Sequence, residues 1–279
     1  MEGHAPSCPL ASAIAVACRS GPARAGSQTA LDMRGGALRL FSFAGIQVYL
    51  HFTWFIVAAL AITQFAGRYS SPIWGFLEYV SLFAIVLLHE FGHALACRQT
   101  GGIADRIILW PLGGIAFVNP PPRPGAYLWS IAAGPLVNVV LFPILSMGLS
   151  AAINGQWMET NPDAYIFVLS IWKINTALLI FNLLPIYPLD GGQIVRGLLW
   201  FAVGRIRSLK IASVIGFAGA IFLVLVAIQQ RSIWLGILAF FVLSQAQAGW
   251  RYAQQLALES EAAGLPATET PPPIPGQRP

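Results

Sequence analysis

The chain has 279 residues, of which 56% are hydrophobic, 12% are aromatic and only 10% are charged, and its net charge is +5. Soluble domains carry about 25% charged residues, so this chain has too few charges to cover a water-soluble globule. Its aromatic content excludes disorder over most of the length. The basic residues lie at the ends of apolar segments, so we expect no nucleic-acid partner. The composition predicts an integral membrane protein in contact with the lipid bilayer.

The apolar segments predict an all-α polytopic membrane protein with about six transmembrane helices, because each is long enough to cross about 30 Å of hydrocarbon. Residues 191–204 are also apolar but follow a Pro-rich break, and we interpret them as a half-helix or an interfacial segment. Residues 1–39 are expected to be a disordered leader and residues 253–279 a disordered, Pro-rich tail, which leaves residues 40–252 as the membrane domain. The predicted spans are 46–66, 74–97, 128–150, 163–185, 211–228 and 232–249.

The distribution of basic residues predicts the orientation of these spans, because loops rich in Lys and Arg stay in the cytoplasm. With both termini inside, thirteen of the sixteen Lys and Arg residues lie on the cytoplasmic side. The outer loops hold only Arg68 and Arg231, and Lys173 lies within the fourth span. We therefore expect a multi-pass protein of the plasma membrane or bacterial inner membrane, with cytoplasmic N and C termini.

The second predicted span ends in His89-Glu90-Phe91-Gly92-His93, an H-E-x-x-H pattern on a helix. Four residues turn a helix by about 400°, so the two imidazoles lie one turn apart on one face and can bind one metal ion. Glu90 is offset by about 100°, close enough to take a proton from a water that zinc activates. Without a metal, these residues would form a polar helix end. We favour the zinc site because an unpaired carboxylate in an apolar helix is costly.

Asp190 is the third metal ligand that remains after elimination, since a catalytic zinc ion usually has three protein ligands. The other acidic residues lie in tails, in loops or at outer helix ends, and no other His or Cys is well placed. Pro185 and Pro188 precede Asp190, and Gly191 and Gly192 follow it. These residues break the fourth helix, and broken backbone at membrane depth is tolerated only against protein or water. A simple loop cap is the alternative role of Asp190.

Three segments together resemble the signatures of the site-2 protease family of intramembrane zinc metalloproteases. The resemblance covers nearly all of residues 40–252 and implies an intramembrane metalloprotease domain there. It implies that His89, His93 and Asp190 bind one Zn²⁺ ion and that Glu90 is the general base. The loop 98–127 and the tail are too short for the PDZ or CBS domains of some relatives, so we expect a minimal form. The three segments are His89–His93, Ala133–Asn138 and Asn182–Gly192.

Two further features of the sequence concern the substrate. Residues 107–118 contain two β-prone arms, which predict a short membrane-embedded β-hairpin-like segment between the second and third spans. By resemblance its edge pairs with an unwound substrate segment, and Gly113 and Gly114 permit the close approach. Asn138 either contacts substrate, as the resemblance implies, or takes part in small-residue helix packing. Asn182 is a further candidate for substrate binding.

The predicted function is that of an endopeptidase that hydrolyses a peptide bond in or near the transmembrane segment of a membrane protein, close to the cytoplasmic face. The resemblance implies a membrane-held regulator, such as an anti-sigma factor, as the substrate. A metal transporter that uses the same ligands is one alternative, and it would need ligand groups at several depths. A catalytically inactive membrane scaffold is another, and such a protein would usually lack Glu90 or a metal ligand.

Overall fold

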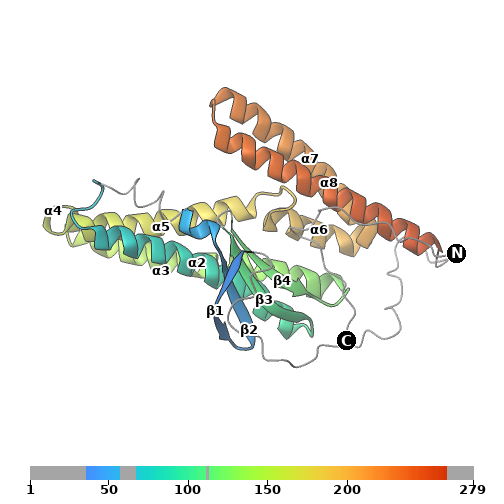
Figure 1. Ribbon diagram of the computed structural model, residues 1–279, viewed down its shortest axis with the longest axis horizontal. Coiled ribbons are helices and arrows are strands. Elements are labelled where there is room, and N and C mark those ends of the chain that lie inside the picture. Colours follow the sequence, from blue (N-terminus) through green and yellow to red (C-terminus); the bar gives the residue numbers. More distant parts are fainter. Residues whose placement is uncertain (1–35, 57–66, 111–112, 263–279) are drawn as a thin grey trace.

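Five long helices dominate the computed structural model, which describes residues 36–56, 67–110 and 113–262 (Figure 1). Each of the five is long and apolar enough to cross a membrane. Pro72, Pro124 and Pro162 open three of them, where the missing N–H of proline costs no helical hydrogen bond. The five helices are α2 (Pro72–Gln99), α3 (Pro124–Asn154), α5 (Pro162–Leu183), α7 (Arg205–Gln229) and α8 (Ile233–Ala262).

Five of the six predicted spans coincide with these helices. The prediction for residues 46–66 is wrong at its beginning, where residues 46–51 form a strand. Residues 53–56 are helical, and residues 57–66 lie outside the described part of the chain. The count of six spans therefore stays a prediction. Two shorter helices, α4 (Trp157–Thr160) and α6 (Asp190–Val203), complete the helical elements that the structure describes, and α6 is the predicted half-helix.

A four-stranded sheet corrects the expectation of an all-α fold. Its strands are β1 (Ala37–Phe43), β2 (Ile46–His51), β3 (Ile103–Trp110) and β4 (Gly113–Asn119), in the order β1-β2-β3-β4. The pair β2 and β3 is parallel, and the other two pairs are antiparallel. Strand β2 has an alternation with period two, which an average of hydropathy over a window does not detect. Ile46 and Val48 are buried, and Gln47 between them is partly exposed.

The hairpin predicted between the second and third spans is present as β3 and β4, but it is half of a larger sheet. Its register pairs Trp110 with Gly113. The other half is the β1–β2 hairpin, which begins inside the segment predicted to be a leader. Ala44 and Gly45 form its turn, and both have positive φ angles, of 49° and 74°, as two-residue hairpin turns of this kind require. The depth of β3 and β4 in the membrane stays a prediction.

The sheet packs against α2, beside the turns that carry the H-E-x-x-H motif (Figure 1). The apolar core between them contains side chains from β2, β3 and α2 that have almost no exposed surface. It fixes the sheet against the same helix that carries the predicted metal ligands. The buried residues of this core are Ile46, Val48, Trp54, Val86, Ala94, Cys97, Ala104, Ile107 and Leu109.

Helices α7 and α8 form an antiparallel pair that lies apart from α2, α3 and α5 (Figure 1). Among the described elements, α8 packs extensively only on α7, and α7 packs on α8 and α6. Helix α8 continues to Ala262, ten residues into the segment predicted to be a disordered tail. The helix persists because Ala253, Leu256 and Ser260 are buried at helical spacing. Residues 263–279 of that tail lie outside the described residues.

Candidate metal centre

Three side chains from two parts of the chain meet at the end of α2. Nε2 of His89 lies 3.0 Å from Oδ2 of Asp190, and Nε2 of His93 lies 3.4 Å from the same oxygen. The two Nε2 atoms are 3.1 Å apart. The helical spacing of four residues aligns the histidines, and the break between α5 and α6 carries Asp190 to them. Within the described residues, this is the one group of three or more His, Cys, Asp or Glu side chains that could hold a metal ion.

The spacing of these three atoms fits a zinc ion. Zinc binds His nitrogen and carboxylate oxygen at about 2.0–2.2 Å in a tetrahedral arrangement, which places neighbouring ligand atoms about 3.3–3.5 Å apart. The observed distances of 3.0, 3.1 and 3.4 Å are close to that value. Three protein ligands leave a fourth position free, as in zinc sites that perform catalysis.

The second ring nitrogen of each histidine, Nδ1, has a hydrogen-bond partner on the side away from the metal position. Nδ1 of His89 lies 2.6 Å from Oδ1 of Asn138, and Nδ1 of His93 lies 2.9 Å from the carbonyl oxygen of Ser130. Because both partners are acceptors, each Nδ1 carries the proton and donates it, which leaves each Nε2 lone pair directed at the metal position. The backbone carbonyl of Ser130 could not have been assigned this role from the sequence.

Asn138 lies behind the metal ligand His89 rather than on an open surface. Its side chain is fully buried, and its amide nitrogen donates to Oδ1 of Asn175 at 2.9 Å. The Asn175 amide in turn donates to the backbone oxygen of Asn138 at 3.1 Å. These two hydrogen bonds fix the orientation of the Asn138 side chain, so that its Oδ1 points at His89. The placement favours a role for Asn138 in orienting that ligand, with Asn175 as its support in α5.

Asn138→Ala is expected to weaken zinc binding by about 10- to 100-fold, the usual cost of removing a group that orients a metal ligand. The substitution removes the acceptor for His89 Nδ1–H and frees the ring to turn. The measurement is chelator competition on the detergent-solubilised protein. Asn154→Ala is the matched control, since Asn154 is exposed at the far end of the same helix. Equal affinity in Asn138→Ala and Asn154→Ala would contradict the orienting role.

Two glycines allow α2 and α3 to cross closely at the metal centre. A Cβ atom at Gly134 would overlap the imidazole of His93, so only glycine fits beside that ligand. A Cβ atom at Gly92 would lie 2.6 Å from the backbone oxygen of Ala133, nearer than atoms in ordinary contact. The small-residue packing predicted for the start of the third span therefore lets α3 approach α2 closely beside His93.

Glu90 lies between the metal ligands and the sheet. Its carboxylate is 6% exposed, and Oε2 accepts a hydrogen bond of 3.0 Å from the backbone N–H of Ala116 in β4. The sheet therefore contacts the residue predicted to be the general base. Strand β4 stands at one end of the strand order, so Gly113 and Gly114 lie at the start of an edge strand.

Asn182 also reaches the ligand cluster. Its amide nitrogen lies 3.5 Å from Nε2 of His89, and its side chain is partly exposed. It therefore differs from Asn138, which is fully buried behind the ligand. Substrate contact stays a prediction for both asparagines, and Asn182 is the more exposed of the two.

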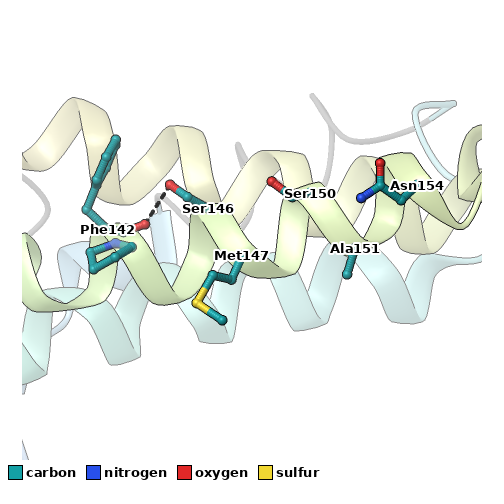
Figure 2. A pocket seen from close by; sticks show the side chains of 7 residues that line it. Phe142, Ser146, Met147, Ser150, Ala151 and Asn154 are labelled. Atoms are coloured by element: carbon teal, nitrogen blue, oxygen red, sulfur yellow. Dashed lines mark hydrogen bonds between the residues drawn. The ribbon is translucent and has the colours of Figure 1, made fainter.

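An open groove along the other half of α3 is separate from the metal centre (Figure 2). In this groove, Oγ of Ser146 donates to the backbone oxygen of Phe142 and accepts a hydrogen bond from Trp172 Nε1. The lining residues include no ionisable side chain, so the groove offers no chemistry for hydrolysis. They are Phe142, Pro143, Ser146, Met147, Ser150, Ala151 and Asn154.

Comparison with known proteins supports the same reading of the site. The chain is 33% identical over 206 residues to a zinc metalloprotease of Methanocaldococcus jannaschii, an alignment that covers 74% of this chain and 58% of that protein. It is 30% identical over 156 residues to stage IV sporulation protein FB of Bacillus subtilis, which covers 54% of this chain and 46% of that protein. The chain thus spans about half of the length of these curated relatives.

A solved structure and a family model agree with these relatives. The fold matches the site-2 protease from Methanocaldococcus jannaschii with a TM-score of 0.54 and 30% identity, covering 77% of this chain and 95% of that one. The model of peptidase family M50 matches residues 78–160 and 147–226, which together include the H-E-x-x-H motif and Asp190. The matched region exceeds half of the sequence. The chain therefore belongs to peptidase family M50, and the resemblance to site-2 proteases predicted from its motifs is confirmed.

Proposed function

We propose that this chain is an intramembrane zinc endopeptidase. The observation that carries the proposal is the meeting of ligand atoms of His89, His93 and Asp190 within 3.4 Å of one another. Glu90 lies in the same apolar helix as the two histidines. When bound, zinc supplies Lewis acidity, which lowers the pKa of water toward about 7. The name of the Methanocaldococcus relative supports the choice of zinc.

Glu90 is the general base in this proposal. The N–H of Ala116 holds Oε2 and leaves Oε1 to accept the proton from the attacking water. The same carboxyl group then returns that proton to the amine that leaves when the peptide C–N bond breaks.

The substrate is a transmembrane segment of a membrane protein, such as an anti-sigma factor or another membrane-held regulator. A helical peptide bond is protected while its N–H and C=O groups are paired, so the substrate must unwind before attack. An extended segment can regain hydrogen bonds by pairing with the edge of β4, beginning at Gly113 and Gly114. The side-chain amide of Asn182 is available to hold the substrate backbone near His89.

The active site is proposed to lie near the cytoplasmic face, with both termini on that side. The support is the position of the basic residues, which favour cytoplasmic loops. Arg98 follows the motif at the end of α2, and Arg196 and Arg205 follow Asp190 in α6 and α7. The outer loops carry only Arg68 and Arg231.

Two other functions have less support. A metal transporter needs successive ligand groups along a path, whereas the described residues form one such group. An inactive scaffold has no need of a carboxylate held beside three metal ligands, and this chain retains Glu90 together with His89, His93 and Asp190.

Asp190→Ala tests the proposal. The variant is expected to lose bound zinc, because two histidines alone rarely hold the ion, and to lose cleavage of a model transmembrane substrate. Zinc content and cleavage are measured on the same detergent-solubilised preparation. Asp105→Ala removes an exposed carboxylate from β3 and serves as the control. Stoichiometric zinc in Asp190→Ala would show that the metal centre is wrongly assigned.

A further inference from the structure

Asp190 is the ligand that needs a separate support. His89 and His93 are fixed by α2 and by the acceptors behind their rings, but Asp190 follows a break in the helical structure at residues 184–189. Within that break, the N–H of Leu189 donates to the oxygen of Ile186 at 2.8 Å, and Nε2 of Gln193 donates to the oxygen of Pro188 at 3.0 Å. These hydrogen bonds are internal. They set the shape of the loop, and Oε1 of Gln193 also accepts a hydrogen bond of 3.1 Å from the hydroxyl of Tyr127 in α3.

Tyr187, three residues before Asp190, contacts a different pair of helices, α7 and α8. A Cβ atom at Gly249 in α8 would lie 2.8 Å from Cε1 and 3.2 Å from Cζ of the Tyr187 ring. A Cβ atom at Gly216 in α7 would lie 2.7 Å from the backbone oxygen of Tyr187. The tyrosine therefore occupies space that exists only because both positions are glycine. We call the space beside Gly216 and Gly249 that holds Tyr187 the Tyr187 socket.

The neighbouring residue of the loop is packed in the same way. A Cβ atom at Gly219 would lie 2.6 Å from Cγ2 of Ile186. Ile186 and Tyr187 thus contact glycine positions of the α7–α8 pair, which otherwise packs extensively only on α6 (Figure 1). The loop that carries Asp190 is one of the places where this pair joins the rest of the molecule.

We propose that Tyr187 is a positioning residue for the metal: its fit in the socket holds the loop so that Asp190 meets His89 and His93. The inference rests on the proposed role of Asp190 as a zinc ligand. Oδ2 of Asp190 lies within 3.4 Å of both Nε2 atoms, so a small shift of the loop opens the ligand cluster. Packing between α7 and α8 thereby sets the zinc affinity of a centre to which neither helix contributes a ligand.

Gly249→Ala is the primary test, made on the full chain in detergent. The added methyl group meets the Tyr187 ring and, at 2.9 Å, Oγ of Ser213. The hydroxyl can rotate away but the ring cannot, so the loop must move, and we expect zinc affinity to fall at least tenfold in chelator competition. Gly236→Ala is the matched control in the same helix, because a Cβ atom there meets nothing within 4 Å. Its affinity is expected to equal that of the wild type. Wild-type affinity in Gly249→Ala would overturn the proposal.

A double substitution separates positioning from a general loss of stability. Tyr187→Ala alone is expected to weaken zinc binding at least tenfold, and Tyr187→Phe to retain it. In Tyr187→Ala combined with Gly249→Ala, the methyl group has no ring to displace and meets only the rotatable Oγ of Ser213, so the affinity should match that of Tyr187→Ala alone. Losses that multiply would show that Gly249→Ala acts independently of the Tyr187 ring, and would overturn the proposal. Tyr187→Leu, which keeps apolar bulk, provides the same comparison if Tyr187→Ala does not fold.

Asp190→Ala distinguishes this proposal from the assignment of the centre itself. If Asp190→Ala retains zinc, the ligand set is wrong. If Asp190→Ala loses zinc while Gly249→Ala and the Tyr187 variants bind it normally, the ligand set stands and only the positioning role of Tyr187 fails.

Discussion

Glu90→Gln is expected to abolish peptide cleavage while zinc stays bound. Glutamine has nearly the same shape as glutamate, and its side-chain oxygen can still accept the hydrogen bond from the N–H of Ala116. It cannot take a proton from water at neutral pH, and loss of a general base costs about 10²- to 10⁴-fold in rate. Because Glu90 is not among the three ligand residues, the metal centre should be intact. Cleavage rate and zinc content, measured on one preparation, report the two effects separately.

The comparison for this variant is Glu159→Gln, which changes an exposed carboxylate in α4. It should cleave substrate at the wild-type rate. Turnover by Glu90→Gln within a fewfold of the wild type would refute the assigned base. Loss of zinc together with activity would instead assign Glu90 a role in holding the metal.

Gly134→Ala is expected to remove zinc and activity together, although it adds only one methyl group. The new Cβ atom would overlap the His93 imidazole, so the ring must leave its position or α3 must move away from α2. In an unconstrained helix the same change stabilises by about 1 kcal/mol, because alanine favours the helix more than glycine does. Zinc content by atomic absorption is the direct measurement.

Gly148→Ala gives the matched control for this prediction, since it lies in the same helix and its Cβ atom would meet nothing within 4 Å. It should bind zinc normally and unfold at a temperature equal to or above that of the wild type. Full zinc occupancy in Gly134→Ala would mean that α2 and α3 can separate there without cost. The close helix crossing would then not be required for the metal.

The metal centre could be proposed from the sequence because a membrane chain has few ionisable residues. H-E-x-x-H on a helix fixes the relation of His89, Glu90 and His93 by helical geometry alone. Asp190 is distant in sequence, but few other acidic residues lie within the membrane domain, so elimination left it as the candidate. The structure brings the three ligand candidates together, and the chemical role of each stays a prediction.

The parts that sequence reasoning missed depend on contacts between distant segments. Strand β2 was interpreted as the start of a helix because its hydropathy is high, and its strand form depends on pairing with β1 and β3. Asn175 and the carbonyl of Ser130 support the histidines only through the packing of α3 and α5 against α2. No local pattern marks such partners, whereas the alternation of apolar and more polar residues in Ile46-Gln47-Val48-Tyr49-Leu50-His51 was a usable signal for β2.

The length of α8 has a mechanical consequence. Thirty residues extend about 45 Å, while the hydrocarbon layer is about 30 Å thick. Trp250 and Tyr252 lie where the apolar part of the helix ends, as aromatic residues at lipid headgroups do. The turns that follow are still packed against protein, since Ala253, Leu256 and Ser260 are buried. One continuous helix therefore connects them to Gly249, so a displacement of these turns would reach the position where α8 meets Tyr187.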